Sequence, residues 1–314
     1  MTQKKLKLRK DRIIIAFAIL IAIIVGIFGI IRDIKLKKTI EYKLTKIGYT
    51  EKETQTILDN TKNEESNIIL KREYHKSIPN LLIQKYFMFD RLERYLAYID
   101  KNEKEKISDV ISIVNANADY NFYENIEKTD TSKNYSLIVN KHYELGKDYA
   151  PNDIVPCSTM YAYDNNSLRE EAYNAFKRLF NAAKADGHTI IINSSYRTYD
   201  WQNEFYNDYK LTHGQSKADS IAARAGHSEH QSGLAIDVAS FNNPSANFED
   251  TEEFTWMSQN CYKYGFILRY PKGKENITGF EYESWHYRYV GIDIATEIHE
   301  KNITFEEYYE YYLK

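Results

Sequence analysis

The stretch that most constrains the fold is residues 228–237, which read SEHQSGLAID. Its second half alternates branched apolar residues with small or acidic ones, and this period of two is typical of a β-strand. The branched side chains would pack into a core on one face. Asp237 would lie on the opposite face and point into a cavity, and the small Ala235 would leave room beside it. We therefore predict a short buried strand at residues 234–238.

A second motif near the C-terminal end complements this strand. Residues 283–286 read ESWH and offer Glu283 and His286. With His230 and Asp237 they supply two imidazoles and one carboxylate, and Glu283 is a further acidic group beside them. Two imidazoles, a carboxylate and an open coordination position form the ligand set of a catalytic zinc site. Residues three apart cannot face the same way in an uninterrupted strand, so we expect a bend between Glu283 and His286.

Both motifs resemble those of a known enzyme family. The patterns Ser-x-His-x-x-Gly-x-Ala-x-Asp and Glu-x-x-His are similar to those of the zinc D,D- and L,D-carboxypeptidases of bacterial cell-wall metabolism, including the VanY-type D-alanyl-D-alanine carboxypeptidases. Lysostaphin-type endopeptidases and hedgehog signalling domains are more distant members of this group. A third family pattern, Ser-x-Tyr-Arg followed by a Gln, occurs at residues 194–197 and Gln202. The resemblance covers residues 150–292 and leaves the N-terminal third unexplained.

The resemblance and the residue types imply a metallopeptidase mechanism. Zinc held by His230, Asp237 and His286 would activate a water molecule and polarise the scissile carbonyl. The family assigns the general base to the Glu three residues before the last His, which is Glu283 here. A carboxylate beside the metal can take up a proton and return it to the leaving amine. Arg197 carries a charged fork suited to a developing oxyanion or to a substrate carboxylate.

Four further residues are expected to contact the substrate. By resemblance, Ser228 and Gln202 would add hydrogen bonds to the C-terminal end of the substrate. Tyr196, which precedes the arginine of the third motif, and Trp285, within the second motif, are expected to line the same pocket. Taken singly, the site residues also have structural alternatives: a buried His can be a satisfied core residue, Arg197 a structural ion pair and Asp237 a turn cap.

Three neighbours of the motifs have less definite roles. His227 would pack behind the ligands or lie on the surface, and Glu229 could face solvent. Some relatives place a second His two residues after the last ligand, where this chain has Arg288. The transition-state role of that His is therefore not available here, and Arg288 takes part of it or none.

The N-terminus carries the pattern of a membrane segment. Residues 13–31 are nineteen residues without a charge, which at about 1.5 Å per residue can span a bilayer core of about 30 Å. Basic residues flank both ends of this run, and the positive-inside bias favours a cytoplasmic N-terminus. We predict that residues 1–38 form a cytoplasmic tail and a single transmembrane anchor, with the body outside the cell membrane. A cleaved signal peptide is the alternative, but the run is long and lacks a small-residue cleavage site after it.

Residues 39–116 have the pattern of a helical module. Thr50 and Glu53 have the spacing of a capping box for a helix that runs towards residue 60. Apolar residues at helical spacing predict a second helix over residues 81–99. We interpret the module as a stalk or spacer, and a small wall-binding module is the alternative.

Residues 117–314 are predicted to form the catalytic domain. Strands are expected at residues 135–139 and 189–193, and Ser167 with Glu170 has the spacing of a capping box before a long amphipathic helix. Helices and strands alternate without a regular βαβ rhythm. This mixture predicts an α+β fold with a mainly antiparallel sheet flanked by helices.

Charge and cysteine content exclude some classes of protein. Residues 1–38 hold ten Lys and Arg against two Asp and Glu, so the remainder has 32 basic and 43 acidic residues. An acidic body lacks the basic footprint that nucleic acid requires. The two cysteines, Cys157 and Cys261, lie outside the metal motifs and form no disulfide framework. We expect them to be small buried apolar residues.

These features predict a membrane-anchored zinc carboxypeptidase that faces the cell wall. Its substrate would be the peptidoglycan stem peptide, from which it would remove the C-terminal D-alanine of D-Ala-D-Ala. An L,D-carboxypeptidase acting on tetrapeptide stems is the first alternative. An endopeptidase fits less well, because Arg197 and Gln202 suit a free carboxylate. A non-catalytic zinc-bearing wall-binding domain fits less well too, because a structural zinc site has no use for Glu283.

Overall fold

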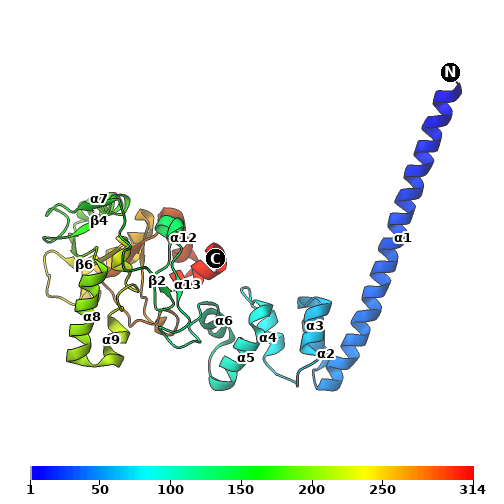
Figure 1. The fold of residues 1–314 in the computed structure, drawn as a ribbon, viewed down its shortest axis with the longest axis horizontal. Helices are drawn as coiled ribbons and strands as arrows, with labels where there is room; N and C mark the ends of the chain where they lie inside the picture. Colours follow the sequence, from blue (N-terminus) through cyan, green and yellow to red (C-terminus); the bar gives the residue numbers. More distant parts are fainter. Residues whose placement is uncertain (1) are drawn as a thin grey trace. The chain divides into compact units, whose positions relative to one another are not determined.

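The computed structural model describes the backbone of residues 2–314 and the side chains of residues 12–35 and 38–314. The chain forms two compact units, Met1–Ile111 and Ser112–Lys314, which are described separately (Figure 1). The basic side chains at residues 4–10, on which part of the predicted cytoplasmic tail depends, lie outside the described residues.

The first unit begins with one long helix. Helix α1, Thr2–Ile47, contains the apolar run, whose side chains from Ile13 to Ile31 are exposed. Among the described residues this helix is long and apolar enough to cross a membrane, and a signal sequence near an N-terminus would share these properties. The helix continues beyond the apolar run and ends at Ile47, just before Gly48.

Short helices complete the first unit. Their bounds are α2 Glu51–Asn60, α3 Asn63–Ile69, α4 Ile78–Leu82, η1 Phe89–Arg91, α5 Leu92–Lys101 and α6 Ile107–Asn115, which reaches into the second unit. The capping box of Thr50 and Glu53 is confirmed at the start of α2. The single helix predicted over residues 81–99 is wrong. The chain leaves the helix after α4, and in the connection Phe87 packs on the ring of Tyr95 in α5, with the centroids 5.4 Å apart.

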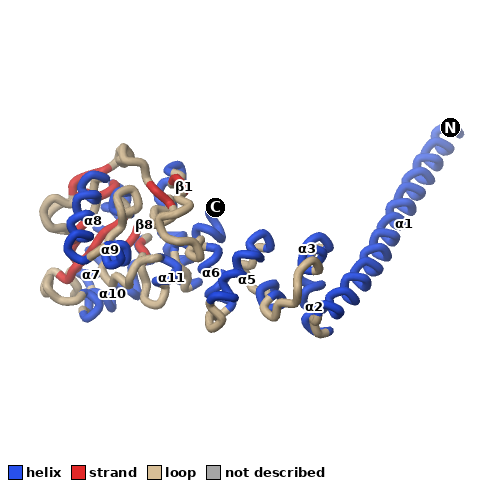
Figure 2. Tube along the Cα trace, turned by 60° about the horizontal axis from the view of Figure 1, so that its bottom comes forward, coloured by secondary structure: helices blue, strands red, loops and turns tan. Residues whose placement is uncertain are grey.

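The second unit is built around a four-stranded antiparallel sheet. Its strands are β5 Ile190–Ser194, β6 Ala235–Ser240, β7 Phe266–Leu268 and β8 His286–Tyr289. The order across the sheet is β5-β6-β8-β7. Helices lie around this sheet in both views (Figure 2). The predicted α+β class is confirmed, and so are the strands expected at residues 189–193 and 234–238, each to within two residues.

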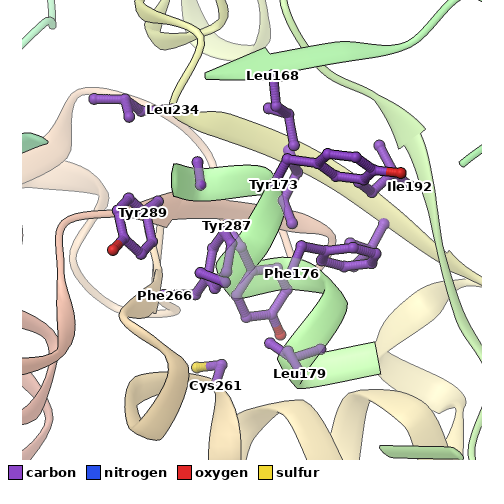
Figure 3. Close-up of a cluster of buried hydrophobic side chains, with 14 of the residues drawn as sticks. Leu168, Tyr173, Phe176, Leu179, Ile192, Leu234, Cys261, Phe266, Tyr287 and Tyr289 are labelled. Carbon is purple, nitrogen blue, oxygen red and sulfur yellow. The ribbon is translucent and has the colours of Figure 1, made fainter. Parts of the chain in front are cut away.

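The core of this unit lies between the sheet and helix α7, Glu170–Ala185. Phe176 and Leu179 of α7 point towards the strands, as Figure 3 shows, and both are fully buried. The predicted apolar stripe of this helix is therefore confirmed, but its predicted capping box is wrong. Residues Ser167–Arg169 form strand β4, which pairs with β3, Ile154–Pro156, so the helix begins only at Glu170.

Several short elements connect these parts. They are β1 Glu127–Lys128, η2 Thr131–Ser136, β2 Tyr143–Glu144, α8 Tyr199–His213, α9 Gln215–Ile221, η3 Glu229–Ser232, η4 Phe248–Asp250, α10 Glu252–Asn260, η5 Cys261–Tyr264, α11 Glu275–Thr278, α12 Ile292–Lys301, α13 Phe305–Tyr308 and the π-helical η6 Tyr309–Leu313. Within the described residues Cys157 and Cys261 are free thiols; Cys261 is buried in the core as expected, whereas Cys157 is only partly buried against it.

The strand predicted at residues 135–139 is wrong. The segment is the end of η2 followed by an irregular stretch in which Leu137, Ile138 and Val139 are buried. The backbone carbonyls of Tyr135 and Leu137 accept hydrogen bonds from the side chain of Arg288, at 3.0 and 2.7 Å. Carbonyl groups that are satisfied by a guanidinium need no neighbouring strand.

Candidate metal and catalytic site

Two strands and one 3-10 helix bring the predicted ligands together. β6 and β8 are antiparallel neighbours, and their register places Asp237 opposite His286. His230 lies in η3, which ends at Gly233 with φ 69°. A Cβ atom at Gly233 would lie 2.6 Å from a side-chain carbon of Ile154. The tight turn from η3 into β6 therefore requires glycine.

The ligand atoms of His230, Asp237 and His286 all lie within 4.8 Å of one another. The Nδ1 atom of His230 lies 2.6 Å from the carbonyl oxygen of Ser195. A carbonyl can only accept, so Nδ1 carries the proton and Nε2 is the free, metal-binding nitrogen. Nε2 of His230 is 3.4 Å from Oδ2 of Asp237, and Nδ1 of His286 is 2.9 Å from Oδ1.

The charges of these groups fit a cation. Burial and the neighbouring Arg197 lower the pKa of His230 to about 4, so its imidazole is neutral at pH 7 and able to bind a metal. Burial opposes the charge of Asp237, yet the imidazoles of His230 and His286 hold its pKa well below the usual value. Burial also opposes a charge on His286, but the neighbouring carboxylates of Asp237 and Glu229 raise its pKa to about 9. The carboxylates on either side of His286 thus favour a positive charge at its ring. A metal ion can supply that charge in place of the proton.

Glu283 lies beside this group of ligands. Its Oε2 atom is 3.8 Å from Nδ1 of His286, and the residue is only 7% exposed. Burial raises the pKa of Glu283 to about 7, where a carboxyl group exchanges a proton readily at neutral pH. A turn at residues 284–285 separates Glu283 from His286, so the predicted bend is confirmed.

Arg197 extends from the end of β5 into the same site. Its Nη2 atom donates to Oδ2 of Asp237 at 2.9 Å, and Nε and Nη2 donate to Oγ of Ser194 at 3.0 and 2.6 Å. Its Nη1 atom is 3.5 Å from Oε1 of Gln202, which is itself fixed by a hydrogen bond to the carbonyl of Ala223. The guanidinium is thus held in one orientation beside the ligands.

A cavity of about 200 Å³ opens over these groups. Its lining includes the predicted residues Arg197, Gln202, Ser228, His230, Asp237, Glu283, Trp285 and His286. Tyr196 is the one predicted site residue that is not among the lining residues. The sequence reasoning missed the aromatic residues Phe205, Tyr270 and Phe280, which also line the cavity. Phe205 lies three residues after Gln202 in α8, on the same face of the helix, so the helix period was a usable signal for it.

Three expectations about the neighbouring residues need correction or refinement. Glu229 does not face solvent but is 1% exposed, next to His286. Arg288 is fully buried, and its donors bind Glu229 and three backbone carbonyls, so the guanidinium takes no part at the cavity. His227 is buried, and its Nδ1 atom lies 2.8 Å from the carbonyl oxygen of Asn140.

The chain is similar to several known proteins. A family model described as VanY, D-alanyl-D-alanine carboxypeptidase, matches residues 165–292. A D-alanyl-D-alanine carboxypeptidase of Enterococcus faecium is 34% identical over 218 residues, which cover 62% of this chain and 68% of the relative. The solved LdcB LD-carboxypeptidase is 39% identical, with a TM-score of 0.56, over 60% of this chain and 91% of its own.

A mutant of the vancomycin-resistance D,D-pentapeptidase VanY, solved in complex with Zn(II), is 33% identical. Its TM-score is 0.49, over 55% of this chain and 98% of its own. This chain belongs to the VanY family of D-alanyl-D-alanine carboxypeptidases.

Proposed function

We propose that this protein is a zinc-dependent carboxypeptidase that removes the C-terminal D-alanine from peptidoglycan stem peptides ending in D-Ala-D-Ala. The observation that carries the proposal is the convergence of His230, Asp237 and His286 on one point of a cavity, with Glu283 and Arg197 beside it. The family model, the E. faecium relative and the solved LdcB protein are all described as carboxypeptidases.

The metal would be held by Nε2 of His230, the carboxylate of Asp237 and Nδ1 of His286. Nitrogen and carboxylate oxygen ligands in this number are those of catalytic zinc. When bound, zinc supplies a Lewis acid that lowers the pKa of water and polarises a carbonyl. Asp237 is shared between both imidazoles and Arg197, which orients the ligands before any substrate enters.

Glu283 is proposed as the general base. Its carboxyl group is buried beside His286 and has a pKa of about 7. A group with this pKa is partly ionised at neutral pH, so it can accept a proton from water and donate it to the leaving amine. No hydrogen bond fixes its carboxylate among the described contacts of the site, which leaves both oxygens available for the transfer.

Arg197, Gln202 and Ser228 are proposed to bind the terminal carboxylate of the substrate. Arg197 holds a buried positive charge at the cavity, and Gln202 lies within 3.5 Å of its Nη1 atom. Because Nε and Nη2 are already bonded to Ser194 and Asp237, Nη1 is the atom of this fixed cation that would donate a charge-assisted hydrogen bond to the substrate carboxylate. Recognition of a free carboxylate favours removal of a terminal residue over cleavage inside a chain. Trp285 would pack against the substrate at the rim of the cavity, since it lines the cavity and is 37% exposed.

Removal of D-alanine from tetrapeptide stems is the second candidate. It is favoured by the likeness to the LdcB LD-carboxypeptidase, which is similar in fold as well as in sequence. Both candidates need the same metal, base and carboxylate site. They differ only in the residue that precedes the scissile bond.

The remainder of the chain is proposed to hold this domain at the membrane. Residues 1–38 would form a single-pass anchor with the catalytic domain on the extracytoplasmic side, and residues 39–116 would act as a helical spacer. The length and apolar character of α1 support the anchor. The catalytic domain would comprise residues 117–314.

The proposal is tested with the full chain in detergent, assayed with added zinc or with a chelator. One substrate is a pentapeptide stem that ends in D-Ala-D-Ala, and the other is a tetrapeptide stem that ends in D-Ala after L-Lys or diaminopimelate. Zinc-dependent release of alanine from the pentapeptide is the expected result. Release from the tetrapeptide alone would establish the L,D activity instead. No release from either, with zinc bound, would favour an endopeptidase or a wall-binding domain.

A further inference from the structure

Glu229 is a buried carboxylate that the proposed mechanism does not use. Its side chain is 0% exposed. Its Oε1 atom accepts two hydrogen bonds, one from Nε of Arg269 at 2.8 Å and one from Nη1 of Arg288 at 2.7 Å. Two charge-assisted hydrogen bonds to one oxygen hold the carboxylate in a single orientation.

The two arginines are themselves held in place. Arg269 donates to both carboxylate oxygens of Glu306, at 2.9 and 2.5 Å, and its side chain is fully buried. Arg288 donates to the backbone carbonyls of Tyr289, Tyr135 and Leu137. The four charged side chains therefore form a closed cluster of two cations and two anions, and none of them can rotate without breaking a buried ion pair.

The second oxygen of Glu229 points to a metal ligand. Oε2 is buried and has no hydrogen-bond partner within this cluster, and Nε2 of His286 is likewise buried and without one. These two atoms lie 3.5 Å apart, at the upper limit of a hydrogen bond. The ring of Tyr270 stacks on His286, with the centroids 4.9 Å apart, and prevents the imidazole from tilting away.

We propose that Glu229 is a positioning residue for the metal centre: its Oε2 atom accepts the proton of Nε2 in His286 and thereby directs Nδ1 to the metal. This inference rests on the proposed zinc site. Metal-binding histidines commonly donate their second N–H to a carboxylate, which fixes the ring orientation and the tautomer. Here the carboxylate comes from the residue next to the ligand His230, so one turn of η3 supplies a ligand for the metal and a support for the other histidine.

A purely structural role is the competing explanation. In that case Glu229 would only neutralise Arg269 and Arg288, for which Oε1 is sufficient. The two explanations differ at Oε2. Glu229→Gln separates them, because a glutamine has one carbonyl oxygen and one NH2 group and cannot accept hydrogen bonds from both the arginines and His286.

Glu306→Gln is the matched control. It removes the same charge from the same cluster and also affects Arg269, but Glu306 does not contact His286. Zinc affinity is measured by chelator competition on the full chain in detergent, and stability is measured by urea unfolding of the metal-free proteins. We expect Glu229→Gln to weaken zinc binding about 10- to 100-fold, and Glu306→Gln to change it less than about threefold while destabilising the fold.

Unchanged zinc affinity in Glu229→Gln, or equal weakening in both variants, would overturn the positioning role. If Glu229→Gln does not fold, long-range ¹H–¹⁵N spectra of the zinc-loaded wild type decide the matter. They are expected to place the His286 proton on Nε2, and a proton on Nδ1 would refute the inference. A wild type that releases alanine without binding zinc would instead refute the proposed metal site, and both inferences with it.

Discussion

Glu283→Gln is predicted to abolish turnover while zinc stays bound. The change removes the proposed base but keeps its size, and the carboxylate lies 3.8 Å from Nδ1 of His286 without a hydrogen bond to any ligand. General bases contribute about 10²- to 10⁴-fold to the rate, which corresponds to about 3–5 kcal/mol of transition-state stabilisation. We expect kcat to fall by this factor and the zinc content to remain one ion per chain, measured by alanine release and by metal analysis.

The same substitution is predicted to stabilise the metal-free protein above neutral pH. Burial raises the folded-state pKa of Glu283 from 4.5 to about 7. Between pH 4.5 and pH 7 the folded protein therefore keeps a proton that the unfolded chain has lost. Stability contributed by the protonated group is fully present below pH 4.5 and is lost as the pH rises through 7. At 1.36 kcal/mol per unit, the ionised carboxylate destabilises the fold by about 3 kcal/mol at pH 8.

Glutamine carries no such penalty, since it does not titrate. Urea unfolding of the chelated proteins should therefore give a gain of about 3 kcal/mol for Glu283→Gln at pH 8 and almost none at pH 4.5. Loss of zinc from the variant would identify Glu283 as a ligand rather than a base. Equal stability of the two proteins at pH 8 would mean that the carboxyl group is not desolvated, and the argument for its pKa near 7 would be wrong.

Three further predictions concern the rest of the site and the chain. His286→Ala should lose both metal and activity, as measured by metal analysis and alanine release, and full activity would refute the assignment of the ligands. Arg197→Lys should raise KM about tenfold or more for a peptide with a free terminal carboxylate, because a compact ammonium group cannot keep the bonds to Ser194 and Asp237 and also reach the substrate; a peptide amide would be the control, and an equal effect on both would argue against carboxylate binding. Deletion of residues 1–38 should release a soluble protein with unchanged kcat/KM, whereas an inactive aggregate would show that α1 is needed by the fold.

The metal ligands could be predicted from the sequence because local patterns determine them. Alternation along residues 234–238 placed Asp237 opposite the apolar face, and the spacing of Glu283 and His286 required the bend that the turn at 284–285 provides. The family pattern connected the two segments. The register between β6 and β8 then brings Asp237 and His286 together. The local patterns could predict the two segments but not this long-range pairing between them.

The position of Glu229 could not be predicted in this way. A glutamate between Ser228 and His230 is of a residue type that is mostly exposed. The 3-10 helix η3 is too short to show a periodic pattern from which a buried face could be assigned. Its burial depends on Arg269 and Arg288, which are distant in sequence and which themselves resemble solvent-facing residues of short strands. The error at residues 135–139 has the same origin, since their β-forming composition gave no indication that Arg288 would bind the carbonyls.

The buried charged cluster around Glu229 is better explained by the orientation it gives to the Glu229 carboxylate than by a contribution to the stability of the fold. Replacing a complete buried ion cluster by packed apolar residues is often neutral or stabilising, whereas removing one member destabilises by about 3–5 kcal/mol. A cluster of this kind therefore adds little stability to a core that already contains Phe176 and Phe266. What it does provide is one fixed orientation of a carboxylate, and that orientation presents Oε2 to His286. Glu306 of α13 holds Arg269 within this cluster, but it does not touch His286, so the orientation of His286 depends on Glu229 itself rather than on the charge of the whole cluster.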